Sequence, residues 1–291
     1  MITGNYYSGK TFLKVLAIAI ASVFIGVFIF EGVRILQNKN TEGLTVTVYN
    51  VGKGDCILVQ QDGYAMMIDC GYQQTAGEIT DYLKLTGIEP ECVIITHYDK
   101  DHVGGAAAFA DSFKTAAFYL PDYEGSSTYY NALMSSLQSP DSSHDISVVK
   151  SDISFKLGDA SVDIYASDVE FDGDNDNDCS LVVSVRYGRD SYLFAGDLEK
   201  EGISAFLAAH SGQWDVIKMP HHGNKKGNVG NLLETVRPGY AIITDSGSDP
   251  ATDDVLELLE TAGAKIWRTS LLGTFYIKSS GSGRYTMQQA I

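Results

Sequence analysis

The chain has 291 residues, of which 44% are hydrophobic and 20% are charged. These proportions are those of a folded globular protein and exclude a disordered chain. The formal net charge of −16 argues against a broadly basic surface for nucleic acid. A local basic rim for an anionic substrate is still compatible with this charge, since five lysines neighbour the motifs described below: Lys53, Lys100, Lys218, Lys225 and Lys226.

The N-terminal segment is apolar enough to cross a membrane. From Phe12 to Phe30 only Lys14 is charged, and a helix of this length rises roughly 28 Å, about the thickness of a bilayer core. The run ends in bulky residues and not in small ones, so an uncleaved anchor is expected instead of a cleaved signal peptide. Lysines before the run favour a cytoplasmic N-terminus, with the main domain outside the cell. We expect a tail and single-pass anchor at 1–36, a linker at 37–43 and the folded domain at 44–291.

The rest of the chain contains two similar series of strands and helices. Alternating residues predict a strand at 44–49, followed by a hairpin whose turn is Asp62-Gly63. A helical pattern around 79–85 precedes the short β-branched run Cys92–Ile95, which is typical of a buried parallel strand. After the acidic loop 171–179, paired strands at 180–186 and 191–195 lead into alternating helices and strands. This order predicts two mixed β-sheets packed together with helices outside.

The strongest chemical signal follows the strand Cys92–Ile95. His97, Asp99, Asp101 and His102 stand within six residues. Because sheets of this kind place ligands beyond the carboxyl ends of their strands, these imidazoles and carboxylates predict a site for one or two metal ions. A polar surface loop that happens to hold two histidines fits less well, since the chain has only six histidines in all.

Three further strand ends carry residues of the ligand type. Asp197 follows Gly196 and could bridge two metals or cap the next helix. His221 and His222 are adjacent and must point in different directions, so one is expected to bind metal while the other serves substrate or proton transfer. Asp69 could orient a histidine ligand or cap a turn.

In chain order, the segments 51–55, 68–71, 97–105, 196–197 and 221–223 resemble the motifs of the metallo-β-lactamase superfamily. Within it they are similar to the hydrolase domains of ComEC-type DNA-uptake competence proteins, and the resemblance covers roughly 44–277. Asp99 stands where the wider superfamily has a histidine and where the ComEC-like branch has an acid. The resemblance is confined to the hydrolase part, so a transport role is not expected to carry over.

The resemblance implies an α/β (α+β) fold, a four-layer αββα sandwich with a dinuclear metal site at one edge. The implied ligands, carried over by position, are His97, Asp99 and His221 for one metal, Asp101 and His102 for the other, and Asp197 as a bridge. The superfamily's mid-chain histidine ligand has no clear equivalent, and Asp178 could fill its position. Oxygen-rich ligation of this kind suits two divalent ions, either zinc or manganese.

Two such ions would lower the pKa of a bridging water and stabilise charge on the attacked group. Asp101 would orient the resulting hydroxide, and His222 or Lys225 would protonate the leaving group or contact a phosphate. The leading hypothesis is a membrane-anchored, extracellular phosphodiesterase or nuclease acting on an anionic substrate, such as DNA or a phosphate ester.

Two alternatives stay open. The enzyme could instead cleave a lactone or a phosphocholine ester at the cell envelope, which the acidic net charge favours. The other alternative is a non-catalytic binding module that the metal stabilises. The acidic loop 172–178 invites a calcium interpretation, but it lacks the sixth-position glycine and distal glutamate of an EF-hand, so a solvated turn fits better. Neither the disulfide state of the four cysteines nor the oligomeric state follows from the sequence.

Overall fold

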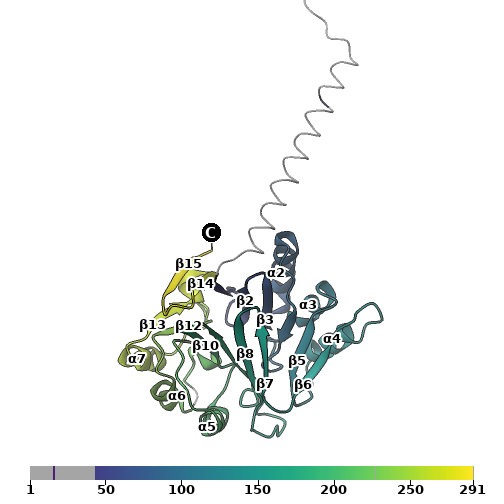
Figure 1. The fold of residues 1–291 in the computed structure, drawn as a ribbon. Coiled ribbons are helices and arrows are strands. Elements are labelled where there is room, and N and C mark those ends of the chain that lie inside the picture. Colours follow the sequence, from purple (N-terminus) through teal and green to yellow (C-terminus); the bar gives the residue numbers. More distant parts are fainter. Residues whose placement is uncertain (1–15, 17–42, 226, 291) are drawn as a thin grey trace, which may run out of the picture.

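Figure 1 shows the computed structural model, which describes residues 43–225 and 227–290 together with Leu16. The predicted tail and anchor fall outside the described residues apart from Leu16, and so does nearly all of the linker, so the membrane helix remains a prediction. Among the residues described, no helix combines the length and the apolar character needed to cross a membrane.

The first sheet has eight strands. They are β1 (Leu44–Val48), β2 (Cys56–Gln61), β3 (Tyr64–Cys70), β4 (Cys92–Ile94), β5 (Ala117–Pro121), β6 (Ile146–Val149), β14 (Phe275–Ser279) and β15 (Tyr285–Gln289). Their order across the sheet is β15-β14-β1-β2-β3-β4-β5-β6. Neighbours from β15 to β3 are antiparallel, and neighbours from β3 to β6 are parallel. The sheet is therefore mixed, as predicted.

The second sheet has seven strands and repeats this scheme. They are β7 (Ile153–Leu157), β8 (Ala160–Tyr165), β9 (Val182–Tyr187), β10 (Asp190–Phe194), β11 (Val216–Lys218), β12 (Tyr240–Ile243) and β13 (Lys265–Arg268). They lie in the order β13-β12-β11-β10-β9-β8-β7. Pairs from β7 to β10 are antiparallel and pairs from β10 to β13 are parallel. Both sheets thus begin with hairpins and continue with parallel strands.

Helices cover the outer faces of both sheets (Figure 1). Their bounds are α2 (Gln73–Thr86), α3 (Ala106–Ser112), α4 (Thr128–Leu137), α5 (Lys200–Ala209), α6 (Val229–Val236), α7 (Asp253–Thr261) and the short α8 (Thr269–Leu272), with a 3₁₀ turn η1 at Pro220–Gly223.

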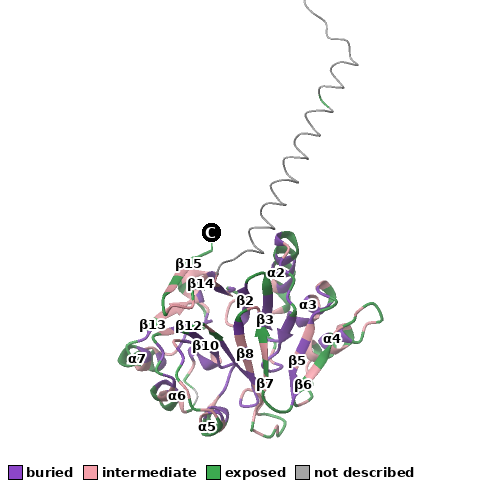
Figure 2. Ribbon diagram, viewed as in Figure 1, coloured by how far each residue is buried: buried purple, intermediate pink, exposed green. Residues whose placement is uncertain are grey.

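Three buried clusters separate the layers. Phe109 of α3 packs in one cluster with Met67 of β3, beneath α2 to α4. Val46 of β1 and Tyr192 of β10 belong to the cluster between the sheets, and Phe206 of α5 belongs to the one beneath α5 to α7. Figure 2 shows the same arrangement, with buried residues concentrated in the strands. The described residues therefore form an αββα sandwich. Strands such as β2 and β10 are buried along their whole length because both of their faces are covered.

Gly105 holds the loop after β4 close to the end of β3. The Gly105 amide donates to the Gly71 carbonyl at 2.9 Å, and the Cys70 amide donates to the His102 carbonyl at 2.8 Å. A Cβ atom at position 105 would lie 2.3 Å from the Cys70 carbonyl oxygen and 2.9 Å from the Ala76 Cβ. The backbone of Gly105 is right-handed, with φ of −85°, so the lack of space, and not backbone strain, requires glycine here.

We expect Gly105→Ala to lower the free energy of unfolding by about 1–3 kcal/mol, the usual cost of overpacking. Gly77→Ala in α2 is the matched control, because a Cβ at position 77 has no neighbour within 4 Å and alanine favours a helix by about 1 kcal/mol over glycine. Urea titration of both variants measures the difference. Equal stabilities would show that the approach of the loop to β3 does not constrain the fold.

Candidate metal centre

Side chains from the ends of both sheets meet in one buried cluster. His97 and His102 follow β4, Asp197 follows β10 and His222 follows β11. The Nε2 atoms of His102 and His222 are 3.3 Å apart. The carboxylate of Asp197 spans them, with Oδ1 3.3 Å from His102 Nε2 and Oδ2 3.1 Å from His222 Nε2. Asp101 Oδ2 lies 3.3 Å from the same His222 atom. Both sheets therefore contribute to a single centre.

The imidazole of His97 presents an unpaired nitrogen to this centre. The Thr96 hydroxyl donates its proton to Asp69 Oδ2 at 2.7 Å, so it must accept from His97 Nδ1, which is 3.0 Å away. His97 Nε2 is then left with a lone pair, and it makes no hydrogen bond although the side chain is fully buried. Burial lowers the pKa of His97 to about 4, so the ring is neutral, as a metal ligand must be.

A second threonine orients His222 in the same way. The Thr244 hydroxyl donates to Asp55 Oδ1 at 2.6 Å and therefore accepts from His222 Nδ1 at 3.0 Å. His222 Nε2 is left to face the cluster. Two carboxylate–threonine–histidine chains thus aim imidazole nitrogens at the same point. The first lies within the first sheet, and the second joins Asp55, which precedes β2, to Thr244 and His222 at the ends of β12 and β11.

The predicted contact of Asp69 with a histidine is present. Asp69 Oδ2 lies 2.7 Å from His102 Nδ1, and Asp69 Oδ1 accepts the Thr96 amide at 2.8 Å. His102 consequently directs Nε2 into the cluster. Asp69 has φ of 55°, in the left-handed region that non-glycine residues seldom adopt. Three of the five such residues in the described chain, Asp69, His221 and His222, lie at this site, which is where backbone strain is typically stored for function.

The structure differs from the prediction in the choice between the paired histidines. His222 is 1% exposed and lies in the cluster, whereas the Nδ1 atom of His221 is 3.0 Å from Glu199 Oε1. Their ring planes are 81° apart, because φ of 48° and 55° at the two residues turns the side chains in different directions. The geometry therefore places His222 among the candidate ligands and His221 beside the cluster.

Asp178 and Lys225 also lie apart from the cluster. Asp178 Oδ1 accepts the amides of Glu199 at 2.9 Å and Gly202 at 2.7 Å, so this carboxylate oxygen caps the start of α5. Lys225 Nζ pairs with Asp254 Oδ2 at 2.5 Å on the surface. These positions therefore do not support Asp178 as the mid-chain metal ligand or Lys225 as a catalytic group.

The two remaining predicted carboxylates differ in environment. Asp99 Oδ2 is 3.9 Å from His97 Nε2, and burial together with the contacting carboxyl group of Asp176 raises the pKa of Asp99 to about 7. Burial would also raise the pKa of Asp101, but the hydrogen bond from His222 and the charge of His102 outweigh it and lower that pKa to about 2. Asp101 is therefore a carboxylate at neutral pH.

Asp55 and Lys218 are site residues to which the sequence assigned no role in the centre. Lys218 was expected on a basic rim, yet it is fully buried and its Nζ lies 2.5 Å from Asp55 Oδ2. The sequence feature that indicates this burial is an isolated lysine inside the apolar run Val216–Met219. Lysine is almost never fully buried unless it is paired, so this position predicted a buried acidic partner.

The charges of the cluster fit divalent cations. Asp55, Asp69 and Asp197 are at most 2% exposed, and Lys218 neutralises only one of them. Burial opposes charge on His222, but the carboxylate of Asp197 outweighs it and raises the pKa of His222 to about 10. Burial likewise opposes charge on His102, but Asp197 and Asp69 raise its pKa well above the ordinary value. The centre thus attracts positive charge, and its imidazole and carboxylate donors suit zinc or manganese.

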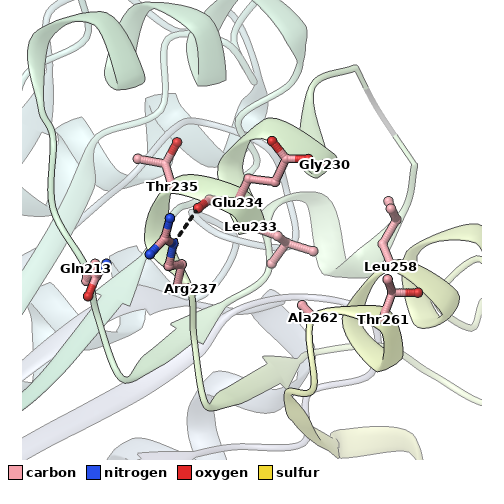
Figure 3. A pocket seen from close by; sticks show the side chains of 9 residues that line it. All are labelled: Gln213, Gly230, Leu233, Glu234, Thr235, Arg237, Leu258, Thr261 and Ala262. Carbon is pink, nitrogen blue, oxygen red and sulfur yellow. Dashed lines mark hydrogen bonds between the residues drawn. The ribbon is translucent and has the colours of Figure 1, made fainter.

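A cavity of about 920 Å³ between α6 and α7 lies apart from this chemistry (Figure 3). It is lined by Gln213, Gly230, Leu233, Glu234, Thr235, Arg237, Leu258, Thr261 and Ala262. Figure 3 shows the guanidinium of Arg237 folded back on the end of α6, where Nε donates to the Glu234 carbonyl at 3.2 Å. None of the cluster residues lines this cavity, so it does not serve the candidate centre.

A family model of the metallo-beta-lactamase superfamily matches residues 49–244. The chain therefore belongs to this superfamily of metal-dependent hydrolases. Solved structures agree on the fold. The metallo-beta-lactamase fold protein YhfI from Bacillus subtilis has a TM-score of 0.56 at 13% identity and covers 84% of this chain and 100% of its own. Zn(2+)-bound PqqB from Methylobacterium extorquens has a TM-score of 0.52 at 11% identity, with coverages of 77% and 97%.

Two curated proteins confirm the likeness to the ComEC-type group. Recombination protein 2 of Haemophilus influenzae is 27% identical over 210 residues, which are 70% of this chain and 24% of that protein. ComE operon protein 3 of Bacillus subtilis is 25% identical over 253 residues, which are 79% of this chain and 32% of that protein. The matches thus span between 24% and 32% of these relatives' lengths.

Replacing the two neighbouring histidines separates their roles. We expect His222→Asn to weaken manganese or zinc binding by roughly a hundredfold or more, since losing even a hydrogen-bond partner of a ligand costs 10–100-fold. His221→Asn should leave binding within a few-fold of the wild type. Asparagine tolerates the left-handed backbone at both positions, so the pair is matched. Isothermal titration with MnCl₂ and ZnCl₂ gives both affinities, and a greater loss in His221→Asn would contradict the placement of His222 in the centre.

Proposed function

We propose that this hydrolase cleaves phosphodiester bonds, with nucleic acid as its substrate class, at a pair of divalent metal ions held by the cluster. The observation that supports this most is the supply of carboxylates, since Asp99, Asp101 and Asp197 stand beside the three imidazoles. Oxygen donors suit the metal ions that act on phosphate esters. The similarity to Recombination protein 2 supports nucleic acid as the substrate class.

His97, His102 and His222 would hold the metal ions together with the carboxylates. Divalent ions in such a site supply Lewis-acid activation of water and stabilisation of charge on the attacked phosphate. Asp101 is ionised, its side chain is 15% exposed, and it lies beside His222. It is therefore placed to orient the attacking water and to accept a proton from it.

His221 takes the role of proton donor in this proposal. Its Nδ1 atom is 3.0 Å from Glu199 Oε1, and its side chain is 16% exposed at the edge of the cluster. A histidine that is held by a carboxylate and reaches solvent can deliver a proton to a leaving oxygen. The geometry supports this assignment, because His222 lies within the cluster and His221 lies beside it.

Hydrolysis of a smaller ester is a second candidate, and one observation favours it. Two of the lysines expected on a basic rim are paired with acids, Lys53 with Asp249 at 2.8 Å and Lys225 with Asp254 at 2.5 Å. Their charges are largely neutralised, so a long anionic polymer gains little from them. A lactone or a phosphocholine ester would not require a basic rim.

The full-length chain loaded with MnCl₂ or ZnCl₂ should cleave DNA and bis-p-nitrophenyl phosphate faster than a lactone or p-nitrophenylphosphocholine. Asp101→Asn should lower kcat by about 10²–10⁴-fold, the range for a lost proton acceptor. Asp163→Asn is the matched control, since Asp163 on β8 lies outside the cluster and accepts an exposed hydrogen bond from Ser154 at 2.6 Å. Cleavage of the lactone, or of p-nitrophenylphosphocholine (itself a phosphodiester), without cleavage of DNA would replace nucleic acid as the substrate class by the second candidate, and no cleavage of any of them would contradict both.

We also propose that the apolar run from Phe12 to Phe30 anchors the enzyme in a membrane with its hydrolase domain outside the cell. Its length and near absence of charge support this. The full chain should resist extraction from membranes by alkaline carbonate, and protease added to intact cells should digest the domain. A chain without residues 1–36 should appear in the supernatant. Release of the full chain by carbonate would contradict the anchor, and protection from protease would reverse the orientation.

A further inference from the structure

Lys218 places a fully buried ammonium behind the candidate metal centre. A lysine has three N–H donors, and each has an acceptor here: Asp55 Oδ2 at 2.5 Å, the Gly196 carbonyl at 3.0 Å and Asp197 Oδ1 at 3.3 Å. Burying a charge is costly, and hydrophobic residues of similar volume often stabilise a core as well or better. Stability alone therefore does not explain a lysine at this position, whereas a role for its positive charge does.

The ammonium fixes both the backbone and the side chain of the segment that carries Asp197. It holds the Gly196 carbonyl and one carboxylate oxygen of Asp197 at the same time. With Oδ1 held, Oδ2 is directed toward His222 Nε2, 3.1 Å away. The carboxylate therefore keeps the rotation in which it spans His102 and His222, which is the orientation that a bridging ligand needs.

The same ammonium decides between two possible groups of ligands. Histidine and carboxylate atoms come within metal-binding reach of one another in the set His97, His102 and Asp197, and also in the set Asp55, His102 and His222. Both oxygens of Asp55 are in use, one by Lys218 and the other by Thr244 at 2.6 Å. Lys218 contacts Asp197 through Oδ1 at the longer distance of 3.3 Å, and Oδ2 of Asp197 stays directed at His222 Nε2.

We propose that Lys218 is a positioning residue, a fixed internal cation that orients Asp197 as a metal ligand and keeps Asp55 out of the ligand set. The inference rests on the metal centre proposed above and assigns a role within it. Lys218 makes no contact with substrate in this proposal and acts only through Asp197.

Comparing Asp55→Asn with the double variant Asp55→Asn/Lys218→Met tests this role. The single variant keeps the contacts of Lys218 with Gly196 and Asp197. The double variant removes the ion pair as a whole, so the net charge near the metals matches the wild type. Any effect of Asp55 on Thr244 and His222 is common to both variants. The two variants differ by the charge of Lys218 as well as by its contacts. Because loss of a nearby cation would by itself strengthen metal binding, weaker binding in the double variant reports the action of Lys218 on Asp197.

The readouts are manganese stoichiometry and affinity, measured by titrating the metal-free full-length proteins with MnCl₂, and the electron paramagnetic resonance spectrum of the loaded proteins. We expect the double variant to fold as well as the single one and to bind manganese about 10–100-fold more weakly, the range for losing a partner of a ligand. The exchange-coupled signal of two bridged manganese ions should be lost in the double variant and kept in the single one.

Equal affinities and equal spectra in the two variants would overturn the role of Lys218 while leaving the metal centre intact. A wild-type protein that binds neither manganese nor zinc would contradict the centre itself, and the role of Lys218 with it. If circular dichroism shows that the double variant does not fold, Lys218→Gln is compared with the wild type by the same titration and spectrum. Glutamine keeps N–H donors but no charge, and unchanged binding there would equally overturn the proposal.

Discussion

Three buried carboxylates, Asp55, Asp69 and Asp197, lie where the two sheets meet, with the Lys218 ammonium as their permanent counter-charge. Desolvating charged groups is expensive unless they are paired and hydrogen-bonded. The surroundings of the cluster follow from that requirement: hydroxyl groups, backbone amides and imidazoles surround the carboxylates, and the remaining negative charge is available to cations. Burial of these carboxylates costs folding free energy, and it also makes the centre attract positive charge.

Two hydrogen-bond chains meet this requirement in parallel ways, one within the first sheet and one that joins the two sheets. In the first, Asp69 accepts a hydrogen bond from the hydroxyl of Thr96, whose oxygen in turn accepts one from His97 Nδ1. In the second, Asp55 and Thr244 do the same for His222. Each hydroxyl has one proton to give, so its direction determines which imidazole nitrogen carries hydrogen. The orientation of the histidines therefore depends on two side chains that contribute no metal ligand.

Much of the fold could be predicted because it depends on local patterns. Hairpin turns and β-branched runs mark β2, β3 and β4, and their repetition in the second half indicates the second sheet. The edge strand β15 was not predicted, since Tyr285–Gln289 is polar and is held by its antiparallel pairing with β14. Such a strand depends on its neighbour and leaves little signal of its own.

The candidate site likewise contains residues that could be predicted from the sequence and residues that could not. His97 and His102 could be predicted because they lie in one short run after a strand. The choice between His221 and His222 depends on a left-handed turn that no local pattern reveals. Asp178 has the right chemistry, but its carboxylate caps α5, and that contact exists only once the helix has formed beside it. Prediction from sequence identifies which residue types are present, whereas these contacts determine which residues are still available to bind a ligand.

The junction between the sheets has a consequence for how the molecule could be divided. β6 and β7 are edge strands of the two sheets. A cut between them would leave His97 and His102 on one fragment, and Asp197 and His222 on the other together with β14 and β15 of the first sheet. Neither fragment would hold a complete centre. Activity in such a split protein would report reassembly of the two halves, because each half supplies what the other lacks.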